Sequence, residues 1–288
     1  MKALVTGAGG QLGRALLANA PADWDCVGLT RGEFDLTDAG AIHDMIAAHA
    51  PDVVLNAAAY TAVDRAESEE PLAFAVNAQA VEAMADAARG FGAHLVHVST
   101  DFVFDGTAAR AYRPGDPRAP LSVYGRSKAA GEDAAGSDAA IVRTAWVYGT
   151  GGANFVITML RLMRTRDEVQ VVADQIGAPT WTTGLAAVVW GLAARRLSGT
   201  FHHSDAGVAS WYDFAVAIQE EALALGLLTR AVPVVPIGTA DYPTPAARPA
   251  FSLLDSTATH AALDLAPVHW RVNLRRMLAE QRALEAME

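Results

Sequence analysis

Tyr124 and Lys128 lie four residues apart, and their side chains are the pair in this sequence that most directly suggests chemistry. The segment that follows Tyr124 is rich in helix formers, and residues four apart share one face of a helix. A phenol titrates near pH 10, and a cation within about 4–6 Å lowers that pKa by roughly 1–3 units. The pair is therefore predicted to act as an acid or base on a hydroxyl or carbonyl group. The spacing alone also fits a surface tyrosine packed on a lysine stem, so a site needs further parts.

Composition narrows the class of protein. The chain has 288 residues, of which 52% are hydrophobic and 19% charged, as in a folded globular protein. A net charge of −10 argues against nucleic acid or an anionic membrane as partner, but it permits a small phosphorylated ligand. Cys26 is the single cysteine, which excludes an internal disulfide and suits a reducing compartment. Without a recognisable signal peptide or an apolar run of about 20 residues, the cytoplasm is the expected location.

A glycine-rich turn supplies the second part of a site. Gly7, Gly10 and Gly13 follow a short apolar strand at residues 1–5 and precede a helix predicted at 14–20. Glycines in this position allow a tight turn, close backbone approach to a pyrophosphate and close helix–strand packing. Amide groups at the helix N-terminus would then face the anion. The turn predicts dinucleotide binding, with a plain glycine-rich turn as the alternative.

The residues after the second predicted strand, 26–29, bear on the choice of cofactor. An acidic residue usually meets the ribose hydroxyl of NADH there, but Arg31 stands in its place. This favours the 2′-phosphate of NADPH over strict use of NADH, although Arg31 also fits a solvated loop charge. Asp35 and Leu36 lie where the edge of an adenine could be met.

Two further strands are predicted to end at the same edge of a sheet. Strand 51–55 is followed by small residues against which a flat ligand could lie, and strand 94–98 is followed by Thr100 and Asp101. Carboxyl ends of parallel strands share one crevice, so a hydroxyl and a carboxylate are expected beside the glycine turn. The alternative for Thr100 and Asp101 is a role as turn or capping residues.

Strands alternating with helices predict an α/β fold, a Rossmann-type doubly wound parallel sheet with a smaller C-terminal substrate domain. We expect residues 1–150 to bind the cofactor, with 181–205 returning to this domain. Residues 151–180 and 206–288 are expected to form the substrate-binding domain.

Several local features carry separate predictions. Residues 72–89 are predicted to form one long helix, in which Asn77 is expected to tie backbone groups and not to act as a catalyst. The proline-rich stretch 232–249 is predicted to be irregular. His202 and His203 are adjacent on a predicted strand, so they point to opposite faces and are not expected to share a metal.

Taken together, the glycine turn, Ser99-Thr100-Asp101 and Tyr124-x-x-x-Lys128 resemble the extended short-chain dehydrogenase/reductase superfamily. Within it, the chain resembles the dTDP-4-dehydrorhamnose reductase family, over nearly its full length. The segments that carry the closer resemblance are residues 56–64, 99–104, 124–132, 143–148, 174–180 and 248–252.

The resemblance implies roles for individual residues. Thr100, Tyr124 and Lys128 would form a catalytic triad, with Thr100 and Asp101 also meeting the sugar and Trp146 lying against its ring. The residues implied around the cofactor are Gly10, Gln11, Leu12, Asp35, Leu36, Ala58, Ala59, Tyr60 and Val98. Arg248 is a candidate partner for the nucleotide diphosphate, and a salt bridge that anchors its loop is the alternative.

The implied activity is reduction of dTDP-4-dehydro-L-rhamnose, a sugar nucleotide, by NADPH or NADH. Some members of the family dimerise around magnesium through an acidic residue just after the glycine turn. Arg14-Ala15 offers no such residue here, so no metal is expected. The sequence leaves open a reductase of another nucleotide-linked keto sugar such as the dihydrostreptose precursor, a non-catalytic NADP-binding regulatory subunit, and a redox-sensing scaffold. It also leaves open a monomer or a homodimer.

Overall fold

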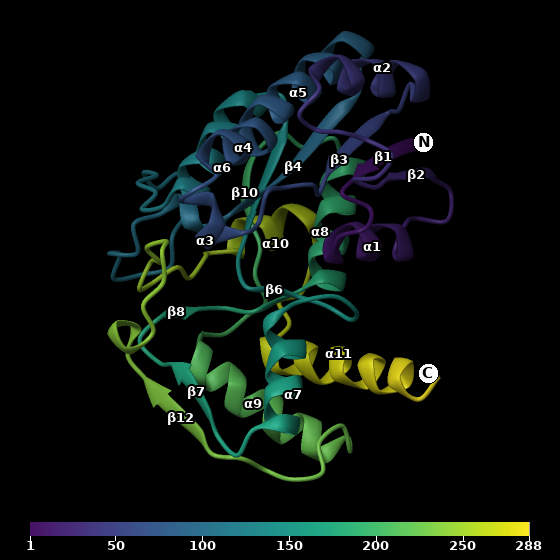
Figure 1. Ribbon diagram of the computed structural model, residues 1–288. Helices are drawn as coiled ribbons and strands as arrows, with labels where there is room; N and C mark the ends of the chain where they lie inside the picture. The colour runs from purple at the N-terminus through teal and green to yellow at the C-terminus, as the bar shows by residue number, and fades with distance from the viewer. Residues whose placement is uncertain (288) are drawn as a thin grey trace.

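A six-stranded parallel sheet forms the centre of the computed structural model, which describes residues 1–287 (Figure 1). The strands are β1 (Lys2–Thr6), β2 (Asp25–Leu29), β3 (Val53–Asn56), β4 (His94–Thr100), β5 (Ala140–Thr144) and β10 (Gly199–His202). Their spatial order is β10-β5-β4-β3-β1-β2, so the direction of winding reverses beside β1. Open sheets of this kind bind ligands at that reversal, beyond the carboxyl ends of the strands. The predicted Rossmann-type doubly wound sheet is confirmed.

Helices cover both faces of this sheet (Figure 1). One layer contains α2 (Ala39–His49), α5 (Ala80–Phe91) and α6 (Val123–Ala135), and the other contains α1 (Gln11–Ala18) and α8 (Thr182–Ala194). Successive residues of a strand point to opposite faces, so Leu4 packs under α2 and α5 while Val5 packs under α1 and α8. Burial on both faces explains why the central strands read as continuous apolar runs.

The predicted helix 72–89 is interrupted. It consists of α4 (Glu70–Phe74), a π-helical turn η1 (Ala75–Gln79) and α5. This turn packs tightly on α6, since a Cβ added to Gly131 would lie 2.0 Å from the Asn77 carbonyl oxygen. The interruption is local, and the helix axis continues into α5 (Figure 1).

A second group of elements lies beyond the carboxyl edge of the sheet (Figure 1). The helices α7 (Phe155–Thr165), α9 (Trp211–Ala224) and α11 (Trp270–Glu285) share one hydrophobic core that includes Phe214 and Met277. The strand β7 (Val169–Val172) pairs in parallel with β12 (Val234–Ile237). The prediction of an irregular 232–249 is therefore wrong over β12, where Pro236 masked the strand pattern because proline is confined to strand edges.

The remaining elements are short. They are β6 (Val147–Tyr148) paired with β9 (Thr180–Trp181), β8 (Ile176–Gly177) paired with β11 (Ala209–Ser210), α3 (Val63–Ala66), α10 (Thr257–Leu263), and the 3₁₀ turns η2 (Asp101–Val103) and η3 (Thr239–Asp241). Within residues 1–287, no helix has both the length and the apolar character needed to cross a bilayer.

Candidate active site

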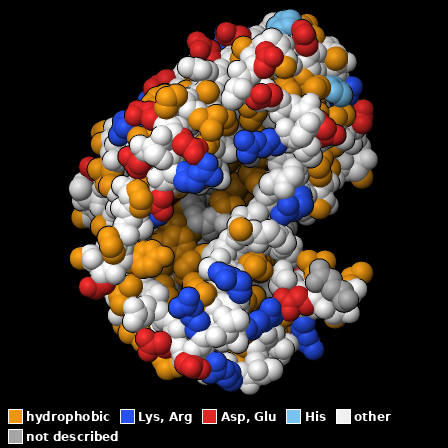
Figure 2. Space-filling model, in the orientation of Figure 1, with side chains coloured by type: hydrophobic (Ala, Val, Ile, Leu, Met, Phe, Trp, Pro, Cys, Tyr) orange, Lys and Arg blue, Asp and Glu red, His pale blue; other side chains and the backbone are white. Residues whose placement is uncertain are grey.

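A cavity of about 1160 Å³ opens at the carboxyl ends of β1, β3, β4 and β5. Figure 2 shows the molecule hollowed between the sheet and the lower group of helices, with hydrophobic side chains along the hollow. The lining combines the glycine turn with α6, and Trp146, Trp211 and Arg248 line it from later parts of the chain. The predicted site residues that line this cavity are Gly7, Gly10, Gln11, Leu12, Arg31, Asp35, Leu36, Ala58, Ala59, Tyr60, Val98, Thr100, Asp101, Tyr124, Lys128, Trp146 and Arg248.

The glycine turn has the geometry that a pyrophosphate cradle requires. Gly7 has φ +70°, and a Cβ on it would lie 2.8 Å from the Cα of Ala58. Gly10 precedes α1 without a side-chain cap, so the first amide groups of the helix are free to meet an anion. Gly13 does not line the cavity. It lies behind the turn, where a Cβ would come within 2.1 Å of the Gly7 carbonyl oxygen. The residues present therefore fit a bound dinucleotide.

Hydrogen bonds from two asparagines fix the backbone of the segment after β3. The Asn56 Oδ1 accepts hydrogen bonds from the Thr6 hydroxyl at 2.7 Å and the Ala58 amide at 3.2 Å. The Asn77 side chain accepts from the Tyr60 amide at 2.8 Å and donates to the Tyr60 carbonyl at 3.1 Å. The predicted role of Asn77 as a backbone tie is confirmed, and the segment presents small side chains to the cavity.

At the far end of the cavity, Asp35 and Arg31 stand on the loop between β2 and α2. Hydrogen bonds from the amide and hydroxyl of Thr37, at 2.9 and 2.8 Å, lower the pKa of Asp35 and keep it a carboxylate. Arg31 is exposed at the rim. A guanidinium in this place can meet a phosphate.

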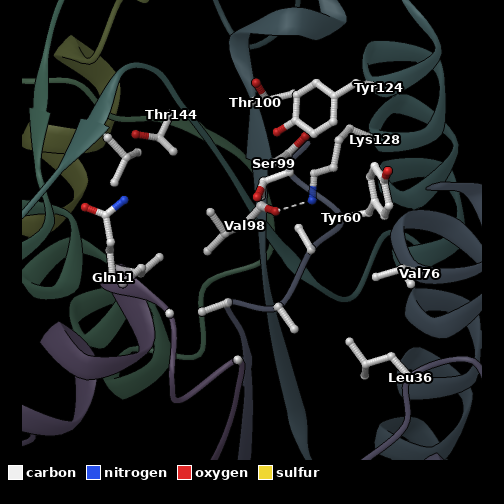
Figure 3. A pocket seen from close by; sticks show the side chains of 18 of the residues that line it. Gln11, Leu36, Tyr60, Val76, Val98, Ser99, Thr100, Tyr124, Lys128 and Thr144 are labelled. Atoms are coloured by element: carbon white, nitrogen blue, oxygen red, sulfur yellow. Dashed lines mark hydrogen bonds between the residues drawn. The ribbon is translucent and has the colours of Figure 1, made fainter. Parts of the chain in front are cut away.

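Thr100, Tyr124 and Lys128 converge on the cavity from two elements (Figure 3). Thr100 ends β4, and its hydroxyl donates to the Asp101 carboxylate at 3.0 Å. Tyr124 and Lys128 lie on α6, whose first turn is capped by the Ser122 hydroxyl. Helix α6 approaches η2 closely, because a Cβ on Gly125 would lie 2.3 Å from the Phe102 carbonyl oxygen.

The predicted effect of Lys128 on the phenol is wrong for this structure. Burial raises the pKa of Tyr124 to about 12; a hydrogen bond with Thr100 lowers it in part, and the Asp101 charge adds to the rise. The ammonium group is directed elsewhere, since Lys128 Nζ donates to the Val98 carbonyl at 2.6 Å (Figure 3). Burial lowers the pKa of Lys128 to about 8. Tyr124 is therefore a protonated phenol, the form that a proton donor needs.

Aromatic and acidic side chains form the opposite side of the cavity. Trp146 has φ +49° and stacks on Trp211, with ring centroids 3.7 Å apart and planes 11° from parallel. Gly177 allows this position, because a Cβ there would lie 2.9 Å from the Trp146 ring. Burial raises the pKa of Asp101 to about 6. The sequence did not predict Trp211 as a site residue. Its one local signal was its position directly after Ser210, the residue that caps α9.

Arg248 faces the cavity and is paired with a carboxylate. Its Nη2 atom lies 2.8 Å from the Asp64 Oδ2, and its Nη1 atom lies 3.0 Å from Oδ1. The ion pair joins the loop that carries Arg248 to α3, the helix that contains Asp64. The two predicted roles of Arg248, as a ligand for diphosphate and as a loop anchor, are compatible if the ligand displaces Asp64.

The structure also locates the two adjacent histidines. His202 Nδ1 lies 2.9 Å from the Tyr112 carbonyl oxygen, and His203 is buried without a hydrogen bond to either ring nitrogen. In the part of the chain that the structure describes, no cluster of three or more His, Cys, Asp or Glu side chains has the geometry of a metal site.

Comparisons with known proteins identify relatives over nearly the whole chain. The family model described as RmlD substrate binding domain matches residues 1–283. A dTDP-4-dehydrorhamnose reductase from Aggregatibacter actinomycetemcomitans is 42% identical, and the match covers 96% of this chain and 98% of that protein. The spore coat polysaccharide biosynthesis protein SpsK of Bacillus subtilis is 41% identical over 97% of this chain and 98% of its own.

A solved structure gives the same result in three dimensions. The crystal structure of dTDP-4-dehydrorhamnose reductase from Bacillus anthracis in complex with NADP aligns with a TM-score of 0.90 and 35% identity. The alignment covers 97% of this chain and 99% of that one. The resemblance stated from the motifs, the NAD(P)H-dependent oxidoreductase class and the cofactor class are thereby confirmed. The chain belongs to the dTDP-4-dehydrorhamnose reductase family.

Proposed function

We propose that this protein reduces the C4 ketone of dTDP-4-dehydro-L-rhamnose to give dTDP-L-rhamnose, using NADPH or NADH. The observation that carries the proposal is the convergence of Thr100, Tyr124 and Lys128 on the cavity that the glycine turn also lines. A regulatory subunit that only binds the cofactor has no need of these three side chains together.

Tyr124 is the proposed proton donor, and Thr100 the group that orients the ketone. The Tyr124 phenol is protonated at neutral pH, since burial raises its pKa to about 12. A hydroxyl at the position of Thr100 can donate to the ketone oxygen as negative charge develops there. Tyr124 then gives that oxygen its proton, and the product hydroxyl forms.

Lys128 is proposed to return a proton to Tyr124 after the transfer, since an ammonium group is a proton donor. Gly7, Gly10 and the amides of Gln11 and Leu12 would hold the pyrophosphate, and Ala58, Ala59, Tyr60 and Val98 would line the nicotinamide half. When bound there, NAD(P)H supplies the hydride, while the protein contributes position and exclusion of water.

The remaining predicted residues are proposed to recognise the sugar nucleotide. Trp146 offers an apolar wall to the sugar ring, Asp101 can accept from a sugar hydroxyl, and Arg248 can pair with the diphosphate. We further propose that residues 1–150 with 181–205 bind the cofactor, and that 151–180 with 206–288 bind the substrate. The place of β10 in the main sheet and the packing of α8 on α1 support this division.

The test is NADPH oxidation with enzymatically generated dTDP-4-dehydro-L-rhamnose, comparing the wild type with Tyr124→Phe. Loss of a general acid is expected to lower kcat by about 10²- to 10⁴-fold. NADPH binding, measured by fluorescence titration, is expected to stay within twofold. Tyr112→Phe is the matched control, because the Tyr112 hydroxyl binds Asp105 outside the cavity.

Two outcomes would contradict the proposal. A folded wild type that binds NADPH and leaves this substrate unreduced would favour another nucleotide-linked keto sugar or a regulatory subunit. Full turnover by Tyr124→Phe would show that the proton comes from another group.

A further inference from the structure

A buried line of polar side chains runs under the cavity from β1 to α6. Thr6, Asn56 and His97 are direct neighbours across β1, β3 and β4, and Lys128 stands at the end of the line. All four side chains are buried, with exposed fractions of 1%, 2%, 0% and 1%. The proposed mechanism uses only Lys128, so the purpose of the other three is open.

The hydrogen bonds of Asn56 fix the orientation of its amide. The Ala58 amide can only donate, so the atom that it meets must be the Asn56 oxygen. The Asn56 nitrogen then points to His97 Nδ1, 3.0 Å away, and must donate to it. His97 Nδ1 is therefore an acceptor and carries no proton.

The tautomer of His97 follows from this contact. Burial lowers the pKa of His97 well below its usual value, and the charge of Lys128 lowers it further, so the ring is neutral. A neutral imidazole without a proton on Nδ1 carries its proton on Nε2. We therefore assign His97 as the Nε2–H tautomer, with that N–H facing Lys128.

This N–H group faces Lys128, whose Nζ lies 3.3 Å from His97 Nε2. An ammonium group has three donors and no lone pair, so a second donor opposite it is unfavourable. A neutral amine can accept from His97 while it still donates to the Val98 carbonyl at 2.6 Å. The contact thus stabilises the amine relative to the ammonium.

Other charged and titratable groups around Lys128 can raise or lower its pKa. Besides Tyr124, Arg126, Glu132 and Asp133 of α6, the titratable and charged groups on the elements packed against this helix are Asp64 and Arg65 of α3, Glu70 of α4, Glu82, Asp86 and Arg89 of α5, His94 and His97 of β4, and Asp101 of η2. Of the charges, that of Glu132 acts on the pKa of Lys128 and raises it, against the larger lowering by burial. His97 adds a directional contact on the side of the amine.

We propose that His97, locked by Asn56 as the Nε2–H tautomer, is a positioning residue that donates to Lys128 and makes its ammonium a stronger acid. This inference rests on the proposed function, in which Lys128 serves Tyr124. A lysine that releases its proton near neutral pH can return a proton to Tyr124 between turnovers, because proton transfer is most efficient when the acid strength lies near the working pH.

The tautomer can be tested on the wild type without any turnover. Imidazole nitrogens with and without a proton differ strongly in ¹⁵N chemical shift, so a long-range ¹H–¹⁵N correlation spectrum of histidine-labelled protein reads the tautomer directly. The His97 signals are those lost in His97→Gln. We expect a protonated Nε2 and a bare Nδ1 throughout the neutral range. A protonated Nδ1, or an imidazolium, would overturn the proposal.

The consequence for Lys128 is tested by the pH profile of kcat/KM for His97→Leu, which puts an apolar side chain in the place of the imidazole and removes the donor. We expect the midpoint of the alkaline limb to move to higher pH by about 0.5 to 1 pH unit. This is the effect of losing one ordinary hydrogen bond to the amine. His94→Leu is the matched control, since His94 is buried on the same strand without a contact to Lys128.

The outcomes separate a purely structural role from the proposed one. A structural role of His97 would lower the rate at every pH and leave the limb in place, which would overturn the proposal. Should His97→Leu fail to fold, the wild-type spectrum still decides the tautomer. A wild type without reductase activity would contradict the proposed function and leave the reading of the spectrum unaffected.

Discussion

The two sides of the cavity are built from different materials. The side proposed to bind the cofactor, residues 7–12 and 57–60 (the cofactor wall), is mostly backbone and small side chains at two adjacent strand ends. The side proposed to bind the sugar nucleotide (the substrate wall) consists of the side chains of Asp101, Trp146, Trp211 and Arg248, which come from distant parts of the chain. A larger residue behind the backbone of the cofactor wall displaces several binding groups together. A substitution in the substrate wall removes only the contacts of one side chain. Substitutions should therefore separate cofactor binding from substrate binding.

The largest effect is expected from Gly13→Ala, behind the cofactor wall. The new Cβ would lie 2.1 Å from the Gly7 carbonyl oxygen and 2.7 Å from the Ala8 Cα, and neither backbone atom can move cheaply. Overpacking of this kind costs about 1–3 kcal/mol, so we expect roughly 10- to 100-fold weaker NADPH binding together with a lower Tm. Fluorescence titration and thermal unfolding measure the two effects.

Gly9→Ala is the matched control in the same turn. Its new Cβ would meet only the Thr30 side chain, at 3.9 Å, which is ordinary contact. NADPH affinity should stay within twofold of the wild type. An equal loss of NADPH affinity in both variants would mean that cofactor binding depends on the flexibility of the turn and not on the space behind it.

The next effect is expected on the substrate wall, from Trp211→Leu. Stacked aromatic pairs contribute about 0.5–1.5 kcal/mol beyond their buried area, so we expect KM for the sugar nucleotide to rise by about three- to tenfold. NADPH affinity should change less than twofold, because Trp211 belongs to α9 and lies outside the glycine turn. Trp24→Leu, which breaks the Trp24–Trp190 pair away from the cavity, is the control. A loss of NADPH binding in Trp211→Leu would contradict the division into two walls.

The same difference explains which features the sequence could reveal. The glycine turn and the alternating strands are local patterns, and their spacing alone predicted the sheet and the cradle. Trp211 could not be found in this way, because it meets Trp146 only when α9 packs against β6. The strand β12 was missed because Pro236 hides a short edge strand that forms only beside β7.

The pKa of Tyr124 shows a second limit of sequence spacing. Residues four apart on a helix start from one face, but a lysine side chain is long enough to reach hydrogen-bond partners on other elements. Lys128 turns to the Val98 carbonyl and His97, both on β4, which the sequence does not place beside it. A spacing of four therefore predicts a shared cavity, and the contacts within it require the fold.

Arg31→Ala tests the one long, charged side chain at the cofactor end. Arg31 is exposed, so salt and solvent weaken its contact with a phosphate. We expect NADPH to bind about three- to tenfold more weakly, as for a single exposed charge-assisted contact. NADH lacks the 2′-phosphate and serves as the internal control, with unchanged affinity. Equal losses for both cofactors would assign Arg31 to the loop and not to the phosphate.

The smallest effect is expected from Asp64→Asn, which releases Arg248 from its ion pair. The side chains of Arg248 and Asp64 are 25% and 40% exposed, so the pair should contribute less than about 1 kcal/mol to stability. The side-chain oxygen that remains after the substitution can still accept from the Ala246 amide, which lies 3.2 Å from Asp64 Oδ1, so the loop should keep its place. If the diphosphate must displace Asp64, removing that charge lowers KM for the sugar nucleotide by about two- to threefold, whereas Arg248→Gln raises it. A rise in KM with both substitutions would instead show that the ion pair itself shapes the substrate wall, because then either half is needed to hold the loop against α3.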